Sequence, residues 1–259
     1  MSTLTTPQIH VHRGGDRMKT RVAWLDSKHS FSFGEHYDPD NTHHGLLLVN
    51  NEDIVLPGEG FETHPHRDME IITWVLSGSL VHQDSLGHNG VIYPGLAQRM
   101  SAGAGILHSE KNDSWRFSAG PEHDEPVHFV QMWVVPDEPG LDPGYQQLEI
   151  DDELAGGALV TVASGLPRYR DRTAIGIGSS HSALHVARMP GLGEAPEVRL
   201  PEAPYLHVFI ARGEVELEGV GTLYEGDAVR LARSGGQRVT ASLPSEILVW
   251  EMHARLGGQ

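Results

Sequence analysis

The chain has 259 residues, of which 39% are hydrophobic, so it can bury one large core or two modest ones. Its formal net charge of −16 argues against direct binding to nucleic acid or to an anionic membrane surface, because both need clustered lysine and arginine. Cysteine is absent, which excludes disulfides and thiolate ligands and leaves only nitrogen and oxygen ligands for any metal site.

The distribution of glycine and proline indicates the fold class. Thirty glycines and 16 prolines fall between short apolar runs, and no long periodic helix is evident. This pattern predicts an all-β sandwich or barrel. The N-terminus has no apolar leader and no 18-residue apolar span occurs, so we expect a cytoplasmic protein.

The first half of the chain divides into short predicted strands. The first twenty residues are polar and predict an arm or an edge strand. Residues 24–33 predict a short strand or loop that carries aromatic side chains. Residues 46–58 predict a strand, a turn and a second strand, and residues 69–83 predict a hairpin with its turn at 77–79.

A linker rich in proline and glycine at residues 136–144 divides the chain. We therefore expect two domains, residues 1–136 and residues 145–259. The second repeats the pattern of short strands and glycine turns, but it contains no H-x-H or H-x-E pair. It is expected to be a related barrel without a metal.

Two short ligand pairs carry the chemistry of the first domain. His64 and His66 form one pair, and His108 and Glu110 form the other. Residues i and i+2 of a strand project from the same face, so each pair can aim two ligands inward. If the two strands lie side by side, three imidazoles and one carboxylate converge, which predicts a metal site. Glycines beside both pairs allow the close backbone approach that a crowded site requires.

Other histidine pairs are weaker candidates. With 17 histidines in the chain, about one H-x-H pair is expected by chance. His10 and His12 form such a pair and are not expected to bind metal. His181 and His185 have a helical ligand spacing but lie in a stretch that predicts a strand, so they are not expected to be ligands either.

Two glutamates compete for the carboxylate position. Glu70 lies four residues after His66, roughly 13 Å along a straight strand, so it reaches the site only if the chain turns back. Glu110 shares a strand face with His108 and is preferred. Glu70 would then orient a ligand imidazole or lie in solvent.

The remaining histidines and aromatic residues are expected to have structural roles. His29 and His82 lack metal-ligand spacing and are expected to be core or loop histidines. One set of aromatic residues is expected in the core rather than in a substrate platform: Trp24, Phe31, Phe33, Trp74 and Trp133.

Several stretches occur in an order typical of one family. They are WLDS at 24–27, HSFSF at 29–33, YDP at 37–39, THPHR at 63–67, HQDS at 82–85 and MSAGAGILHSE at 100–110. In this order they resemble the pirin family of bicupins, over nearly the whole chain. The general cupin signature is also present, as Gly58, five residues, the pair at 64 and 66, three residues, and Glu70.

The resemblance implies two antiparallel jelly-roll barrels packed face to face, with the metal in the N-terminal barrel. It implies His64, His66, His108 and Glu110 as ligands, usually around iron. It also implies quercetin 2,3-dioxygenase activity, in which flavonols are opened with dioxygen and carbon monoxide is released. Because eukaryotic members are described as cofactors of transcription regulators, the alternative is a non-enzymatic, redox-responsive regulatory protein that binds a protein partner.

We therefore expect a metal-dependent dioxygenase that holds one divalent metal ion. Iron is expected first, with nickel, cobalt, manganese, copper and zinc as alternatives. Glu110 is the expected catalytic residue, because it can take the proton of a metal-bound flavonol hydroxyl. The expected partners are a small aromatic, flavonol-like substrate and dioxygen. We expect no direct nucleic-acid or membrane partner, and a monomer.

Overall fold

The structure is a computed structural model that describes residues 6–112, 124–191 and 197–257. Strands dominate these residues, which contain a single short α-helix, α1 (Asp151–Leu154). The predicted all-β class is confirmed. No helix in the described ranges is both long enough and apolar enough to cross a membrane.

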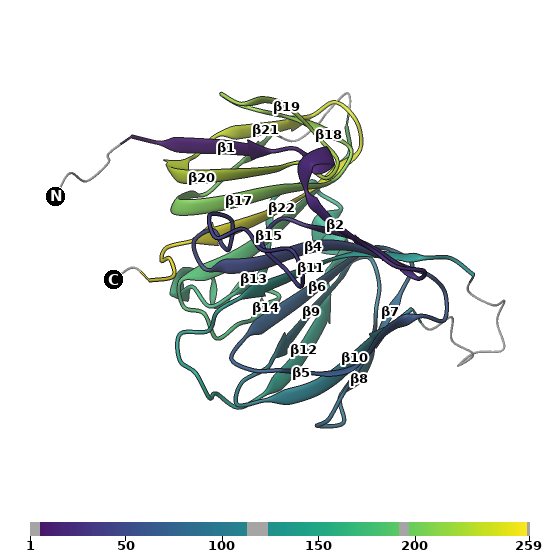
Figure 1. Ribbon diagram of the computed structural model, residues 1–259. Helices are drawn as coiled ribbons and strands as arrows, with labels where there is room; N and C mark the ends of the chain where they lie inside the picture. The colour runs from purple at the N-terminus through teal and green to yellow at the C-terminus, as the bar shows by residue number, and fades with distance from the viewer. Residues whose placement is uncertain (1–5, 113–123, 192–196, 258–259) are drawn as a thin grey trace.

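The first half of the molecule is a barrel made of two sheets (Figure 1). Its strands are β2 (Met18–Arg21), β3 (Leu25–His29), β4 (Leu47–Val55), β5 (Gly60–His66), β6 (Glu70–Ser77), β7 (Leu80–Asp84), β8 (Asn89–Ile92), β9 (Leu96–Ser101), β10 (Ile106–Lys111), β11 (Val127–Val134) and β12 (Gly144–Glu149). The larger sheet has the order β12-β9-β6-β11-β4-β3-β2, and the smaller has the order β5-β10-β7-β8.

The second half repeats this plan. Its strands are β1 (Gln8–His12), β13 (Val160–Ser164), β14 (Ile175–Gly176), β15 (Ser182–Met189), β16 (Val198–Arg199), β17 (Glu202–Arg212), β18 (Glu214–Leu217), β19 (Gly221–Tyr224), β20 (Ala228–Gly235), β21 (Arg238–Ala241) and β22 (Ser245–Met252). The larger sheet has the order β1-β20-β17-β22-β15-β13-β14, and the smaller has the order β16-β21-β18-β19. Pairing is antiparallel throughout these strands except between β13 and β14.

The two seven-stranded sheets pack against each other through one shared core (Figure 1). Strand β6 shows how the sequence builds this core. Ile72, Trp74 and Leu76 lie in the core between the halves, whereas Ile71 and Val75 belong to apolar clusters within the first barrel. Successive strand residues face opposite sides, so a continuous apolar run supplies two cores at once. The predicted face-to-face pair of barrels is confirmed.

Two strands cross the expected division of the chain at residues 136–145. Strand β1 pairs with β20 and extends the larger sheet of the second half. Strand β12 pairs with β9 and extends the larger sheet of the first half. Each sheet thus gains an edge strand from the other half of the sequence, which covers hydrogen-bonding groups that an open edge would expose. The boundaries 1–136 and 145–259 stay a prediction for the chain and do not coincide with the division between the sheets.

Two predicted turns were wrong. Residues 47–55 form one unbroken strand, β4. Residues 50–53, where the turn was predicted, lie within this strand and are all buried. Strands β6 and β7 do not form a hairpin, because β6 lies in the larger sheet and β7 pairs with β10 and β8 in the smaller sheet. The chain passes from one sheet to the other at Gly78, whose φ of +74° suits glycine.

The interiors of the two barrels differ in polarity. The second barrel is filled by a large apolar cluster that includes Leu206, Val208 and Val239. The first barrel holds two smaller apolar clusters and several buried polar side chains, among them Glu110 and Gln131. Buried polar groups need partners, so their concentration in the first barrel indicates that a functional site lies there.

Candidate metal centre

The two predicted ligand strands are neighbours. Strand β5 pairs with β10 in antiparallel register, with His64 opposite His108 and His66 opposite Ile106. The register shifts between His108 and Glu110, so that Glu110 lies opposite Phe61. This β-bulge changes the direction of the chain between the two residues of the second pair.

Glycines allow close backbone approach beside both ligand pairs, as expected. Gly60, in β5, has a φ of +156°, and a Cβ atom there would overlap the carbonyl oxygen of Glu110. Gly103 precedes β10 with a φ of +48°, and a Cβ atom there would overlap the carbonyl oxygen of Leu141. A larger residue at either position would therefore push the ligand strands out of place.

Three of the four predicted ligands form one compact group. The nitrogen atoms that His64, His66 and His108 can offer all lie within 4.8 Å of one another. His64 Nε2 and His108 Nε2 are 3.1 Å apart, and His66 Nε2 is buried without a hydrogen-bond partner. Burial lowers the pKa of both His66 and His108 to about 4, so their imidazoles are neutral at pH 7. Neutral imidazoles with an orphaned nitrogen fit a divalent metal ion.

Glu110 lies beside this group and belongs to an overlapping one. Its carboxylate lies with His82 and His108 in a second set of ligand atoms within 4.8 Å of one another. Gln131 Nε2 donates to Glu110 Oε2 at 2.6 Å, and Thr73 Oγ1 donates to Oε1 at 3.2 Å. Burial raises the pKa of Glu110, but the neighbouring histidines and the bond from Gln131 outweigh this effect and hold the pKa below its ordinary value. The structure therefore presents Glu110 as an oriented anion.

Glu70 lies outside both groups. It is buried at the start of β6, where Ser101 Oγ donates to its Oε2 at 2.7 Å. Burial raises the pKa of Glu70, whereas the pKa of Glu110 is held below its ordinary value. Its other bonding partner is the backbone of Gly178, in the second half, so Glu70 has no bond to His64, His66 or His108.

A cavity of about 1040 Å³ leads to the candidate site. His64, His66 and Glu110 line it. Four aromatic side chains form part of its walls, in two edge-to-face pairs: Trp24 with Phe61, and Phe33 with Trp133. Its remaining lining is largely polar and charged, including Lys19, Arg21 and Glu62. A cavity of about this size can hold a small molecule.

Comparison with known proteins identifies the family. A family model described as Pirin matches residues 11–134. A Mycobacterium tuberculosis protein named "Putative quercetin 2,3-dioxygenase" is 58% identical over 253 residues, which are 97% of this chain and 98% of the relative. The chain belongs to the pirin family. A pirin relative from Escherichia coli K12, named "Quercetin 2,3-dioxygenase", is 33% identical over 94% of this chain and 98% of its own length.

Solved structures confirm the pirin architecture. YhhW from E. coli superposes with a TM-score of 0.81 at 31% identity, over 96% of this chain and all of YhhW. A second YhhW structure, described as a bacterial pirin in complex with nickel(II), matches with the same TM-score at 30% identity and the same coverage.

Several residues of this pirin that are expected in structural positions lie near the site. His82 was expected to be an ordinary core or loop histidine, but it lies next to His108 and Glu110. Trp24 and Trp133 line the cavity and also pack against apolar clusters of the first barrel, so the core expectation holds for them in part. Phe33 lines the cavity, and Trp74 is in the core as expected. Phe31 is also in the core. His82 and Trp133 reach the site because of the lateral order of their strands.

The polar residues of β4 are a further missed part of the site. Asn51 and Asp53 are buried and line the cavity, and each has a side-chain oxygen, Oδ1, without a partner. In the sequence, Asn51 and Asp53 are spaced i and i+2, which places both on one face of a strand. Asn and Asp also favour turns, so a turn was predicted at these positions instead.

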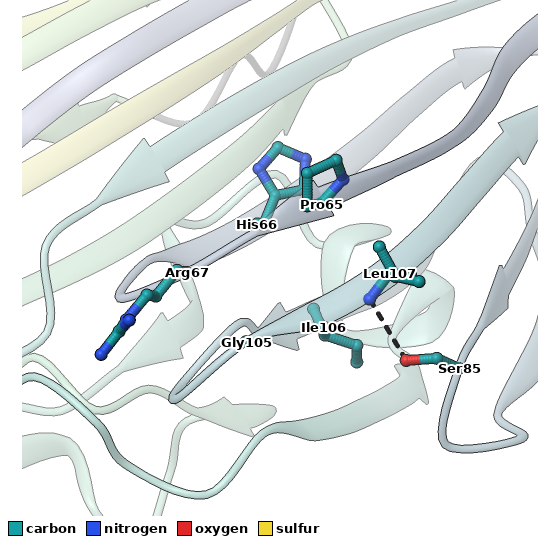
Figure 2. Close-up of a pocket in the computed structure, with 7 residues that line it drawn as sticks. All are labelled: Pro65, His66, Arg67, Ser85, Gly105, Ile106 and Leu107. Atoms are coloured by element: carbon teal, nitrogen blue, oxygen red, sulfur yellow. Dashed lines mark hydrogen bonds between the residues drawn. The ribbon is translucent and has the colours of Figure 1, made fainter.

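A second, more open pocket of about 470 Å³ lies beside His66 on the same pair of strands. Figure 2 shows its lining residues, with the backbone N–H of Leu107 bonded to Ser85 Oγ at 3.2 Å. The side chain of Leu107 is 47% exposed, so this pocket offers an apolar surface near the candidate site.

Proposed function

We propose that this pirin opens flavonols such as quercetin with dioxygen, with His64, His66, His108 and Glu110 holding one divalent metal ion. The observation that carries the proposal is the aromatic-walled cavity of about 1040 Å³, which reaches His64, His66 and Glu110. The names of the M. tuberculosis and E. coli relatives support the same activity.

Iron is the proposed metal, with nickel, cobalt, manganese, copper and zinc as alternatives. Three imidazole nitrogens and one carboxylate suit divalent first-row metals in general, and the nickel(II) complex of YhhW supports an ion of this class. When bound, such an ion acts as a Lewis acid that lowers the pKa of a coordinated hydroxyl. Because His66 and His108 are neutral at pH 7, they need not lose a proton before binding it.

Glu110 is proposed as the base that takes the proton from the flavonol 3-hydroxyl. The hydroxyl O–H bond breaks and its proton moves to a carboxylate oxygen of Glu110. Gln131 and Thr73 hold this carboxylate beside the ligand group before substrate enters, and it changes its bonding when it takes the proton. The resulting electron-rich flavonolate reacts with dioxygen, whose two oxygen atoms enter the products while one carbon leaves as carbon monoxide.

Aromatic side chains of the cavity wall lie beside the ligand group. Trp133 lies against the ligand group, with its ring 4.8 Å from that of His66, and its indole N–H is bonded to Gln131. Phe33 packs edge-to-face on Trp133. These rings offer apolar faces to a planar aromatic substrate, which would displace water from beside the reacting carbon when it binds.

The test is quercetin bleaching by metal-loaded protein, followed with and without dioxygen. The wild type should bleach quercetin only aerobically and release carbon monoxide. His108→Ala and Glu110→Ala should each lose about 100-fold or more, whereas His10→Ala, outside both ligand groups, should match the wild type. Equal bleaching by the wild type and the two site variants would overturn the proposal.

The second candidate is the regulatory role, in which a protein partner binds in a metal-dependent, redox-responsive way. The open pocket beside His66, with its exposed Leu107, supports this candidate. Leu107→Asp separates the two roles, because it should weaken binding of a partner to this surface and leave quercetin turnover unchanged. A turnover loss in Leu107→Asp equal to that of His108→Ala would contradict this separation.

A further inference from the structure

His108 directs its two ring nitrogens to two different histidines. Its Nε2 lies 3.1 Å from His64 Nε2, and its Nδ1 lies 3.4 Å from His82 Nδ1. Both His108 and His82 are buried. Because the two nitrogens of an imidazole point away from each other, only Nε2 of His108 can face an ion shared with His64 and His66.

Asp84 bonds to the other side of His82. His82 Nε2 is 3.4 Å from Asp84 Oδ2, which also accepts from His88 Nδ1 at 2.9 Å. Asp84 Oδ1 accepts from the backbone N–H groups of Leu86 and His88, at 2.9 and 3.0 Å. Two backbone N–H groups already donate to this carboxylate, which as an anion can only accept. Nε2 of His82 must therefore carry the proton, and its Nδ1 is left as an acceptor.

This assignment determines the tautomer of His108. Since His82 Nδ1 accepts, His108 Nδ1 must be the donor in the 3.4 Å contact between them. His108 Nε2 then carries a lone pair, directed toward the group it forms with His64 and His66. The strand register supports the same chain of contacts, because β10 pairs with β7 so that His108 lies opposite Asp84.

The opposite placement of an ion, between His82, His108 and Glu110, agrees less well with the structure. It would leave the buried Nε2 of His66 without a partner. It would also leave His64 and His66 outside the group of ligands. An ion at Nε2 of His108 gives the orphaned nitrogen a partner.

We propose that His82 and Asp84 are positioning residues that fix His108 in the tautomer with its Nε2 free for the metal ion. This inference rests on the metal site of the proposed function. The ring of His82 is itself held by Tyr145 of β12, which stacks on it with ring centroids 4.8 Å apart. Metal-bound histidines commonly donate their other N–H group, and loss of the acceptor typically costs 10–100-fold in metal affinity.

The experiment measures nickel(II) affinity of the full-length protein by competition with a coloured chelator, together with the visible spectrum of the cobalt(II)-loaded protein. His82→Phe removes the acceptor and should weaken nickel binding by about 10–100-fold, with the cobalt spectrum retaining the wild-type band pattern. His82→Asn places a carbonyl oxygen near the position of Nδ1 and should bind nickel more tightly than His82→Phe. Asp84→Asn should also weaken nickel binding, whereas His88→Gln, one step further from His108, should stay within about twofold of the wild type.

The outcomes separate this inference from the proposed function. If the wild type binds nickel and His82→Phe and Asp84→Asn bind it equally well, the positioning role is overturned and the metal site stands. If His82→Phe abolishes binding and changes the cobalt bands while His66→Ala binds normally, His82 is itself a ligand and the positioning role is overturned. A wild type that binds no first-row divalent metal would overturn the proposed function. If His82→Phe does not fold, the nickel affinities of His82→Asn and Asp84→Asn are compared instead. Tighter binding by His82→Asn supports the positioning role, and equal or weaker binding overturns it.

Discussion

His64 Nε2 and His108 Nε2 lie 3.1 Å apart on two paired strands, with the unpartnered Nε2 of His66 in the same group. Three electron-rich nitrogens this close together are stable only when they share a proton or a cation. A metal ion that binds only the folded state should therefore stabilise it.

Adding nickel(II) at about 100 times its Kd should raise the free energy of unfolding by about 2.7 kcal/mol. For a chain of this size, that corresponds to an increase in Tm of roughly 5–10 °C, measurable by scanning calorimetry. A chelator should reverse the increase, and His66→Ala should show little or none of it. An equal increase in His66→Ala would show that the metal binds elsewhere.

Asp53 should recognise a hydroxyl group of the substrate. Asp53 is buried in the cavity wall, where burial raises its pKa to about 7. Its Oδ1 has no partner, so a phenolic O–H can donate to it. Asp53→Leu should raise the KM for quercetin by about tenfold, with a smaller change in kcat. The control is 3-hydroxyflavone, which lacks the ring hydroxyls and should show the same KM with both proteins. An equal change in KM for both flavonols would contradict a specific contact.

Trp74 should be a main determinant of stability between the two halves. It is fully buried in the shared core, and its indole N–H donates to Glu246 of β22 at 2.5 Å. Trp74→Phe loses this bond and some packing, so the free energy of unfolding should fall by about 2–4 kcal/mol in urea titrations. Trp133→Phe, in the cavity wall, should lose less than half as much. Equal losses would argue against the importance of the interface.

Acid should destabilise the fold through buried histidines. Burial, with Arg230 nearby, lowers the pKa of both His12 and His44 to about 4. Between pH 6.5 and about 4 the unfolded chain takes up protons at these sites and the folded chain does not, so stability present above pH 6.5 is lost as the pH falls. His44→Gln should lose less stability than the wild type between pH 7 and pH 4.5, measured as the change in the urea midpoint. Equal losses would exclude a contribution from His44.

The sequence determined which side chains can act together within one strand. The i, i+2 spacing at 64 and 66 puts both imidazoles on one face, and the structure brings both together with His108. The apolar run at residues 69–76 predicted a strand, and the structure divides Ile71 and Ile72 of this strand between two cores. These features are local consequences of the period of a strand, so they can be read without knowing the fold.

Tertiary structure decided which strands are neighbours. His82 and His108 are 26 residues apart, and they meet only because β7 pairs with β10. The bulge after His108, the insertion of β1 beside β20, and the burial of Asp53 within an unbroken β4 depend in the same way on distant partners. Lateral strand order depends on the packing of whole sheet faces against each other. It therefore cannot be predicted from residue spacing along one strand.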